Sequence, residues 1–240
     1  MKRLLHAMLG TCGLVLASGI AQAQNSIAVN STAAMGSANG GTACGGNMCG
    51  LEVVFPGGST NPAKVVDESP NDQSVYRATF WYDASNLATN PSATGFFHVP
   101  LRTTETTLVR SPIMLLMTQK FNLYRLSARA GTNTAGVFRI TNRIDLTGAN
   151  KVQVEWSQSS APGVAAGDMV VRILEGPQAG ECVSIRDFTG VGLNNSNMNI
   201  DDVHLGAVGN VSPSISGSEY FDEFESYETL TAGFSGSCTP

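Results

Sequence analysis

Val75-Tyr76-Arg77-Ala78-Thr79-Phe80-Trp81-Tyr82-Asp83 is the stretch that decides the fold of this chain. Apolar side chains occupy every second position, and the positions between them carry Arg77, Thr79, Trp81 and Asp83. A period of two is typical of a β-strand with one face in a core and the other in solvent. Residues 151–157 repeat the pattern, with Trp156 on the apolar side. We therefore expect two amphipathic strands, with Trp156 in the core and Trp81 exposed.

Short apolar runs separated by turn residues continue along the rest of the chain. Further candidate strands are residues 51–55, 95–99, 113–117, 122–129, 136–140, 169–174, 182–188, 200–206 and 219–226. No stretch keeps a helical period of 3.6 over ten residues. About eleven short strands with Gly, Pro, Asn or Ser between them predict an all-β, antiparallel two-sheet sandwich of the jelly-roll type.

The first 23 residues have the layout of a secretory signal. Lys2 and Arg3 precede an apolar stretch over residues 4–16, and Ala21-Gln22-Ala23 is a small-x-small cleavage site. The sequence therefore predicts a secreted or periplasmic protein, cleaved near Ala23. Three parts follow the signal: a leader rich in Gly, Ser and Asn over residues 24–50, a sandwich domain over 51–230, and a tail over 231–240.

Four cysteines remain after cleavage, namely Cys44, Cys49, Cys182 and Cys238. An even number in an exported chain predicts two disulfides. The glycine-rich stretch around the first two favours local pairing of Cys44 with Cys49, which leaves Cys182 with Cys238. In the alternative pairing, both early cysteines reach across to the two later ones.

Composition and charge limit the classes of partner. Hydrophobic residues make up 42% and charged residues 14% of the chain, which indicates a folded domain. The formal net charge of −5 argues against nucleic acid, because it indicates that no basic patch is present to displace counterions from phosphates. The longest apolar run after the signal, residues 113–117, is far shorter than the roughly 20 residues of a transmembrane helix. The oligomeric state stays open.

The acidic segment near the C-terminus is the strongest hint of catalysis, and it lacks the required pattern. Retaining glycosidases need two carboxylates about 5 Å apart on one face. Glu223 and Glu225 share a face, but Glu219 and Asp222 have opposite parity. These acids, like His98 and His204, are therefore interpreted as surface residues. No nucleophile motif occurs, and we expect no enzymatic activity.

Two groups of residues are candidates for ligand binding. The first lies in an Asn-rich loop, where side-chain oxygens of the kind calcium prefers come from Asn194, Asn195, Asp201 and Asp202. The same residues are also common in turns that bind no metal. The second group is the expected solvent face of the paired strands, formed by Arg77, Trp81, Gln153 and Glu155. An exposed Trp beside hydrogen-bonding groups predicts carbohydrate binding, because its ring can stack on a sugar.

Four segments together resemble a known group of proteins. They are residues 74–83, 151–156, 200–208 and 219–226, whose sequences SVYRATFWYD, KVQVEW, IDDVHLGAV and EYFDEFES occur in the same order as similar strands in that group. The group comprises exported bacterial proteins with a concanavalin A-like, laminin-G-like sandwich. The resemblance implies a fold and an exported location but no activity, because its superfamily includes lectins, glycosidases and plain spacers.

These observations predict an exported, non-catalytic, lectin-like module that binds glycan. The alternative is a structural or protein-interaction module of the cell envelope. A divergent glycoside hydrolase is the least favoured possibility.

Overall fold

The structure is a computed structural model, and it describes residues 26–30, 50–68, 70–89, 96–106, 110–120, 123–232 and 234–238. The signal sequence over residues 1–23 and the pairing of Cys44 with Cys49 lie outside these residues, so both stay predictions. Within the described ranges no helix is long and apolar enough to cross a membrane.

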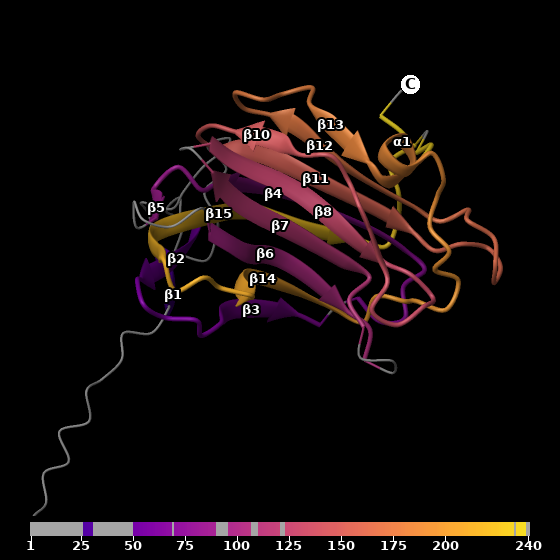
Figure 1. Cartoon of the computed structure of the whole chain (residues 1–240), viewed down its shortest axis with the longest axis horizontal. Coiled ribbons are helices and arrows are strands. Elements are labelled where there is room, and N and C mark those ends of the chain that lie inside the picture. Colours follow the sequence, from indigo (N-terminus) through magenta and orange to yellow (C-terminus); the bar gives the residue numbers. More distant parts are fainter. Residues whose placement is uncertain are drawn as a thin grey trace, which may run out of the picture.

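The predicted all-β class is confirmed, because the chain forms two antiparallel sheets (Figure 1). One sheet has eight strands in the order β1-β2-β15-β4-β11-β12-β13, and β5 also pairs with β15. The bounds of its strands are β1 Ser26–Asn30, β2 Gly50–Pro56, β4 Val75–Asp83, β5 Leu87–Thr89, β11 Asn150–Ser157, β12 Asp168–Glu175, β13 Cys182–Ser184 and β15 Ile215–Tyr227.

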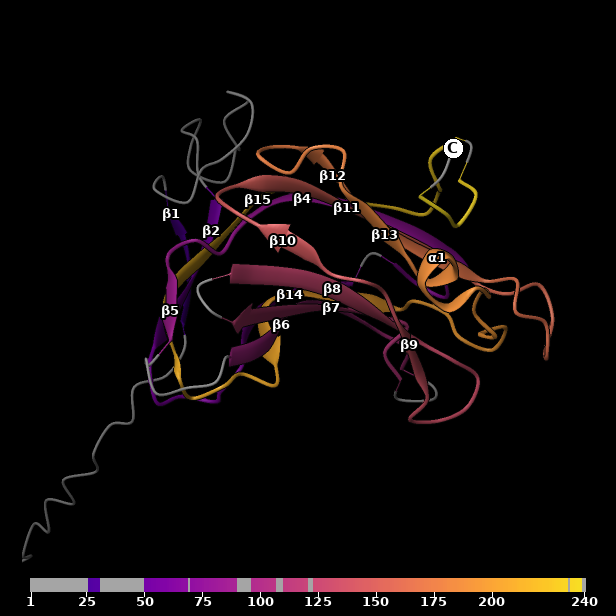
Figure 2. The same ribbon diagram turned by 45° about the horizontal axis from the view of Figure 1, so that its top comes forward.

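The second sheet has seven strands in the order β10-β8-β7-β6-β14-β3, and β9 also pairs with β8. Its strands are β3 Ala63–Asp67, β6 Phe96–Thr104, β7 Ile113–Lys120, β8 Leu123–Gly131, β9 Phe138–Ile140, β10 Ile144–Leu146 and β14 Asp202–Gly209. Figure 2 shows the two sheets stacked as curved layers, with β6, β7 and β8 beneath β4 and β11.

The core lies between the sheets and follows the predicted alternation. On β4 the side chains of Tyr76, Phe80 and Tyr82 are buried, and on β11 Trp156 is fully buried. β4 and β11 pair directly, with Tyr76 opposite Trp156. The predicted core faces of these two strands are therefore confirmed.

A buried polar group joins the two sheets. Glu219 Oε2 on β15 accepts hydrogen bonds from the Tyr82 hydroxyl and from His98 Nε2, each at 2.7 Å. His98 belongs to β6 in the other sheet, and both His98 and Glu219 have no exposed surface. Burial, and next the charge of Glu219, raise the pKa of the Tyr82 hydroxyl. The interpretation of His98 and Glu219 as surface residues is therefore wrong.

Several short elements depart from the expected strands. β1 lies in the predicted leader and pairs with β2. The expected strand over residues 182–188 ends at Ser184 and continues as a short helix, α1 Ile185–Thr189. Ser184 caps this helix, because its side chain accepts a hydrogen bond from Asp187 N at 2.9 Å. Gly190 ends it with a φ of 72°, which favours glycine.

Candidate functional site

The predicted sugar-binding face is covered by later parts of the chain. Residues 228–232 and 234–238, which we call the C-terminal tail, contact Arg77, Glu155 and Arg172 on the outer face of the eight-stranded sheet. Glu155 is fully buried there, accepting bonds from Thr231 N at 2.7 Å and from Arg172 Nη1 at 2.6 Å. Trp81 is 9% exposed, and its Nε1 donates to Glu223 Oε2 at 3.2 Å. The expected exposure of this face is therefore wrong.

The other two residues of that face are also engaged. Gln153 is buried at 8% exposure. The Arg77 guanidinium lies over the Tyr227 ring at 4.3 Å and donates to Thr231 Oγ1 at 3.2 Å. Strand alternation correctly placed Arg77, Trp81, Gln153 and Glu155 on the face away from the core. It could not show that a later segment covers them.

A disulfide fixes the C-terminal tail. Cys182 at the start of β13 is bonded to Cys238, as predicted. Beside it, the Asp187 carboxylate accepts bonds from Ser237 Oγ and from Cys238 N, both at 2.7 Å. Burial opposes ionisation of Asp187, but these two bonds lower its pKa overall. The tail is therefore held by a covalent bond and by a charged hydrogen-bond acceptor.

We expect reduction of this disulfide to open the C-terminal tail. Loss of the covalent bond leaves the tail held only by hydrogen bonds, and open states of such a segment become populated. The amide of Thr231, which donates to Glu155, should then exchange with deuterium faster, while the amides of β11 keep their protection. Faster exchange in β11 as well would show that the core itself opens.

The predicted calcium ligands are held by protein donors at separate places. Asn194 Oδ1 accepts from Asn133 Nδ2 at 2.9 Å, and Asn195 Oδ1 accepts from the Ser159 backbone at 2.8 Å. The carboxylates differ in their partners: Asp201 accepts from Thr106, and Asp202 accepts from Thr104 and from His204. No cluster of three His, Cys, Asp or Glu side chains suited to a metal occurs among the described residues. Calcium binding stays a prediction.

A different face, the outer face of the seven-stranded sheet, carries a row of functional side chains. Alternation on β7 sends Ile113 and Leu115 into the core, so Met114 between them points outward. The strand registers place five residues directly opposite one another across neighbouring strands. In order from β14 to β9, these are His204, Arg102, Met114, Arg129 and Ile140. Opposed side chains have Cβ atoms about 4.5–5.5 Å apart, so the row is continuous across the sheet.

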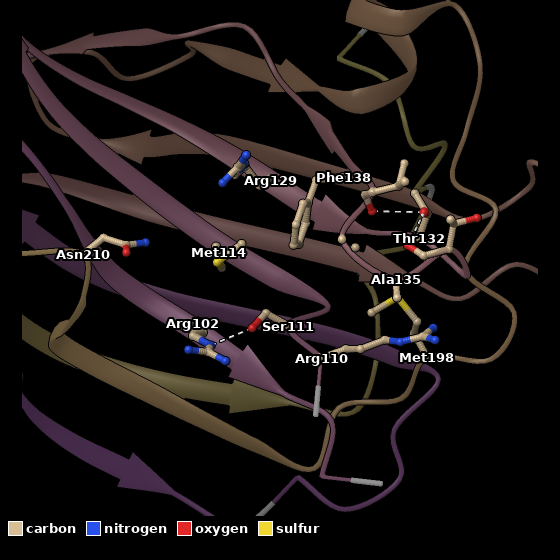
Figure 3. A pocket seen from close by; sticks show the side chains of 14 residues that line it. Arg102, Arg110, Ser111, Met114, Arg129, Thr132, Ala135, Phe138, Met198 and Asn210 are labelled. Atoms are coloured by element: carbon tan, nitrogen blue, oxygen red, sulfur yellow. Dashed lines mark hydrogen bonds between the residues drawn. The ribbon is translucent and has the colours of Figure 1, made fainter. Parts of the chain in front are cut away.

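A cleft of about 450 Å³ opens on this row. Figure 3 shows Arg102, Met114 and Arg129 lying across the strands, with Arg110 to one side. Apolar side chains contribute part of the lining, including Met114, Phe138 and Met198, and Ser111, Thr132 and Asn210 add polar groups. The cleft therefore combines an apolar surface with three guanidinium groups.

Neutral groups hold each of the three arginines in place. Arg102 Nε donates to Ser111 Oγ at 2.6 Å, and Arg110 Nη1 donates to the Asn133 carbonyl at 3.0 Å. The Arg129 guanidinium lies 4.9 Å from the centre of the Phe138 ring. None of the three forms a salt bridge with a carboxylate in the described part of the chain. Their positive charges are therefore available to an anionic ligand.

Charge is divided between the two sheets. The strands of the seven-stranded sheet contain six basic and three acidic residues, a formal charge of +3. Those of the eight-stranded sheet contain three basic and nine acidic residues, a formal charge of −6. The chain has a net negative charge, but its seven-stranded sheet is basic. This corrects the inference from net charge that the chain has no basic patch.

His204 stands at one end of the row as a neutral imidazole. Lys64 Nζ, which can only donate, lies 2.8 Å from Nδ1, so Nδ1 is the acceptor. Nε2 therefore carries the proton and donates to Asp202 Oδ1 at 2.9 Å. Burial, and next the Lys64 charge, lower the pKa of His204, with a smaller contribution from Arg102, while Asp202 opposes them. At neutral pH this imidazole is a base with its lone pair on Nδ1.

Sequence reasoning missed the whole row. The signal that could have identified part of it lies in residues 122–129, where Arg125 and Arg129 fall on the face opposite Leu126 and Ala128. His204 was noted and interpreted as a surface residue, although its imidazole is only 14% exposed.

Comparison with solved structures finds several that are similar to this chain. No known family model matches the chain, and no curated protein matches it. The crystal structure of alginate lyase PA1167 from Pseudomonas aeruginosa is similar at 13% identity and a TM-score of 0.46, covering 74% of this chain and 82% of that chain.

These comparisons correct one prediction and leave another as it was. A structure named as an enzyme contradicts the predicted non-catalytic, lectin-like module, and that prediction is not pursued. With no matching family model, membership of the exported bacterial group stays a prediction, whereas the sandwich that the resemblance implied is confirmed. The likeness concerns the arrangement of strands, so the function proposed below is argued from the side chains of this chain.

Proposed function

We propose that the protein is an enzyme that cleaves an acidic polysaccharide bound across the outer face of the seven-stranded sheet. The observation that carries this proposal is the convergence of Arg102, Arg110 and Arg129 on one cleft without a paired carboxylate. A guanidinium presents a planar fork of donors that matches a carboxylate in a bidentate geometry. A ligand with regularly spaced carboxylates fits these three guanidinium groups best.

The apolar part of the cleft favours a sugar as the carrier of those carboxylates. Phe138 and Met114 lie between and beside the arginines. An aromatic ring can pack on the C–H face of a pyranose while the charged substituents reach the guanidinium groups. Arg102 and Arg129 are two strand spacings apart, roughly 9.5 Å, so they can contact different units of one extended chain.

The side chains of the row suit cleavage by elimination. Hydrolysis with retention or inversion uses a pair of carboxylates at the scissile bond, whereas elimination from a uronate uses a cation at the carboxylate and one base. Arg102 binds the substrate carboxylate and so stabilises the negative charge that develops on it. Arg102 and His204 lie directly opposite on neighbouring strands. The base that acts beside Arg102 is therefore His204.

The reaction then proceeds through a proton transfer. Lys64 moves from Nδ1 of His204 to the anionic substrate, which frees the lone pair. His204 Nδ1 takes the proton from the carbon next to the carboxylate. The bond from the neighbouring carbon to the glycosidic oxygen breaks, the departing oxygen takes up a proton from a water molecule, and a carbon–carbon double bond forms in the sugar. The imidazolium then returns its proton to the hydroxide that this leaves. Asp202 stabilises the imidazolium that results.

Export is part of the proposal. A structural disulfide such as Cys182–Cys238 persists in oxidising compartments outside the cytosol. Cleavage of the signal near Ala23 would deliver the enzyme to polysaccharides of a cell surface or its surroundings.

The proposal is tested by incubating the folded protein with mannuronate, guluronate and galacturonate polymers. Elimination gives an unsaturated uronate, detected by its ultraviolet absorbance, whereas hydrolysis gives reducing ends without that absorbance. Dextran is the neutral control, and single-stranded DNA is the control for a polyanion of another class. Binding of uronates without either product would contradict the enzymatic proposal, and equal binding of DNA would contradict the sugar specificity.

The pH dependence of kcat/KM tests the role of His204. Because the pKa of His204 is lowered from 6.5 in the folded protein, the neutral base persists below that pH. We expect the acidic limb of the kcat/KM profile to lie below the ordinary histidine range, and His204→Gln to remove activity. The neutral imidazole likewise contributes stability above pH 6.5, and this is lost as the pH falls through the folded pKa. If His204→Gln kept some activity and its acidic limb were unchanged, the titration behind that limb would belong to a group other than His204.

A further inference from the structure

The structure has a second cleft beside the first, and its residues have no role in the reaction above. It measures about 430 Å³ and is lined by Arg125, Ile140, Thr141, Asn142, Arg143, Asp145 and Phe188. Two large apolar side chains in this lining are exposed, Phe188 at 51% and Ile140 at 38%. They come from α1 and β9, which are far apart in the sequence. A surface that exposes such side chains around a hollow is typical of a binding site.

The second cleft also carries positive charge. Arg143 is exposed and forms no ion pair with another residue in the ranges that the structure describes. Arg125 Nε donates to Asp145 Oδ1 at 2.9 Å, but Asp145 is more than half exposed. An ion pair in such a setting contributes little energy, so Arg125 can exchange this partner for a ligand.

The two clefts lie beside each other along β9. Phe138 lines the first cleft and Ile140 lines the second, and their positions two residues apart place them on one face of the strand. Arg129 of the first cleft lies directly opposite Ile140, and Arg125 of the second lies four residues along β8 from Arg129. That separation is about 13 Å along the strand. One extended chain can therefore contact both clefts.

We infer that the second cleft is a subsite for a remote anionic unit of the same polysaccharide. Arg143 binds the carboxylate of that unit, and Phe188 packs against its ring. This inference rests on the proposed function and adds to it a preference for long chains. Oligosaccharides too short to reach Arg143 are cleaved from the first cleft alone.

The test uses purified uronate oligosaccharides of increasing length with the full protein. We expect kcat/KM to rise with length and then level off once the oligosaccharide spans both clefts. Arg143→Ala and Phe188→Ala should each lower kcat/KM for the long substrates by roughly tenfold and leave the short ones unchanged. Both side chains are exposed, so the fold should tolerate their removal.

Arg139→Ala is the matched control. Arg139 is exposed on β9 between Phe138 and Ile140, so its side chain points to the opposite face, and its removal changes the net charge equally. Arg139→Ala should leave kcat/KM unchanged for oligosaccharides of every length. An equal loss in Arg143→Ala for short and long substrates, or no loss for either, would overturn the subsite while leaving the proposed function intact. A protein that cleaves no uronate of any length would overturn both.

Discussion

Replacing Arg102 by alanine is expected to lower kcat/KM for an acidic polysaccharide by a factor of about 10²–10³, the usual cost of removing one preorganised donor at a developing negative charge. Arg102 lies in the row between His204 and Met114, and a hydrogen bond of 2.6 Å to Ser111 Oγ fixes its orientation. The guanidinium therefore needs little reorganisation when the substrate carboxylate gains charge. Measurement of kcat and KM on one uronate polymer checks this expectation.

Two further variants separate charge from geometry at this position. Arg102→Lys keeps the charge and loses the planar fork, so its activity should fall between those of the wild type and Arg102→Ala. The Arg102 charge also lowers the pKa of His204, so the acidic limb should move to higher pH in any residual activity of Arg102→Ala. Arg139→Ala removes the same charge on β9 and should leave kcat/KM unchanged. A comparable loss in Arg139→Ala would mean that net charge alone attracts the polymer.

Replacing Trp156 by alanine should destabilise the protein by about 3–5 kcal/mol, against a total free energy of unfolding of about 5–15 kcal/mol for a domain. Trp156 is fully buried on β11, with Tyr76 opposite on β4 and Met169 opposite on β12. The change removes the largest side chain of the core and leaves a cavity between the sheets. Equilibrium unfolding in urea measures the loss.

Trp81 provides the comparison within the same chain. If Trp81 were exposed, as the alternation alone suggested, Trp81→Ala would leave stability nearly untouched. Its side chain is instead only 9% exposed and donates to Glu223, so we expect a measurable loss that is smaller than that of Trp156→Ala. Equal losses in the two variants would mean that Trp81 on the outer face contributes as much to the free energy of unfolding as Trp156 in the core.

Strand periodicity predicted much of the fold for a physical reason. β4 and β11 are long enough for a period of two to stand out, and their core faces follow from it. β5 and β10 have three residues each, too few to show any period. α1 was missed because it is short and depends on the Ser184 cap rather than on an amphipathic pattern.

The site was harder to predict than the fold, because it depends on which strands are neighbours. Arg102, Arg110 and Arg129 come from separate parts of the sequence and meet only through the order β6-β7-β8. Alternation assigned Trp81 and Glu155 to an outer face, but it could not show that Glu223 covers the first and the C-terminal tail the second. Local patterns determine the face on which a side chain lies, and tertiary pairing determines what that face meets.

The position of β15 has a consequence for how the chain is made. β15 lies between β2 and β4, so a strand that is synthesised long after both of them fills the place between them in the sheet. Until Tyr227 has been synthesised, β2 and β4 have no partner on their facing edges. Such edges invite pairing with other chains, and distant pairings form slowly. A nascent chain of this protein therefore depends on being kept apart from its neighbours until β15 has been synthesised, and a chain that stops before Ile215 should aggregate.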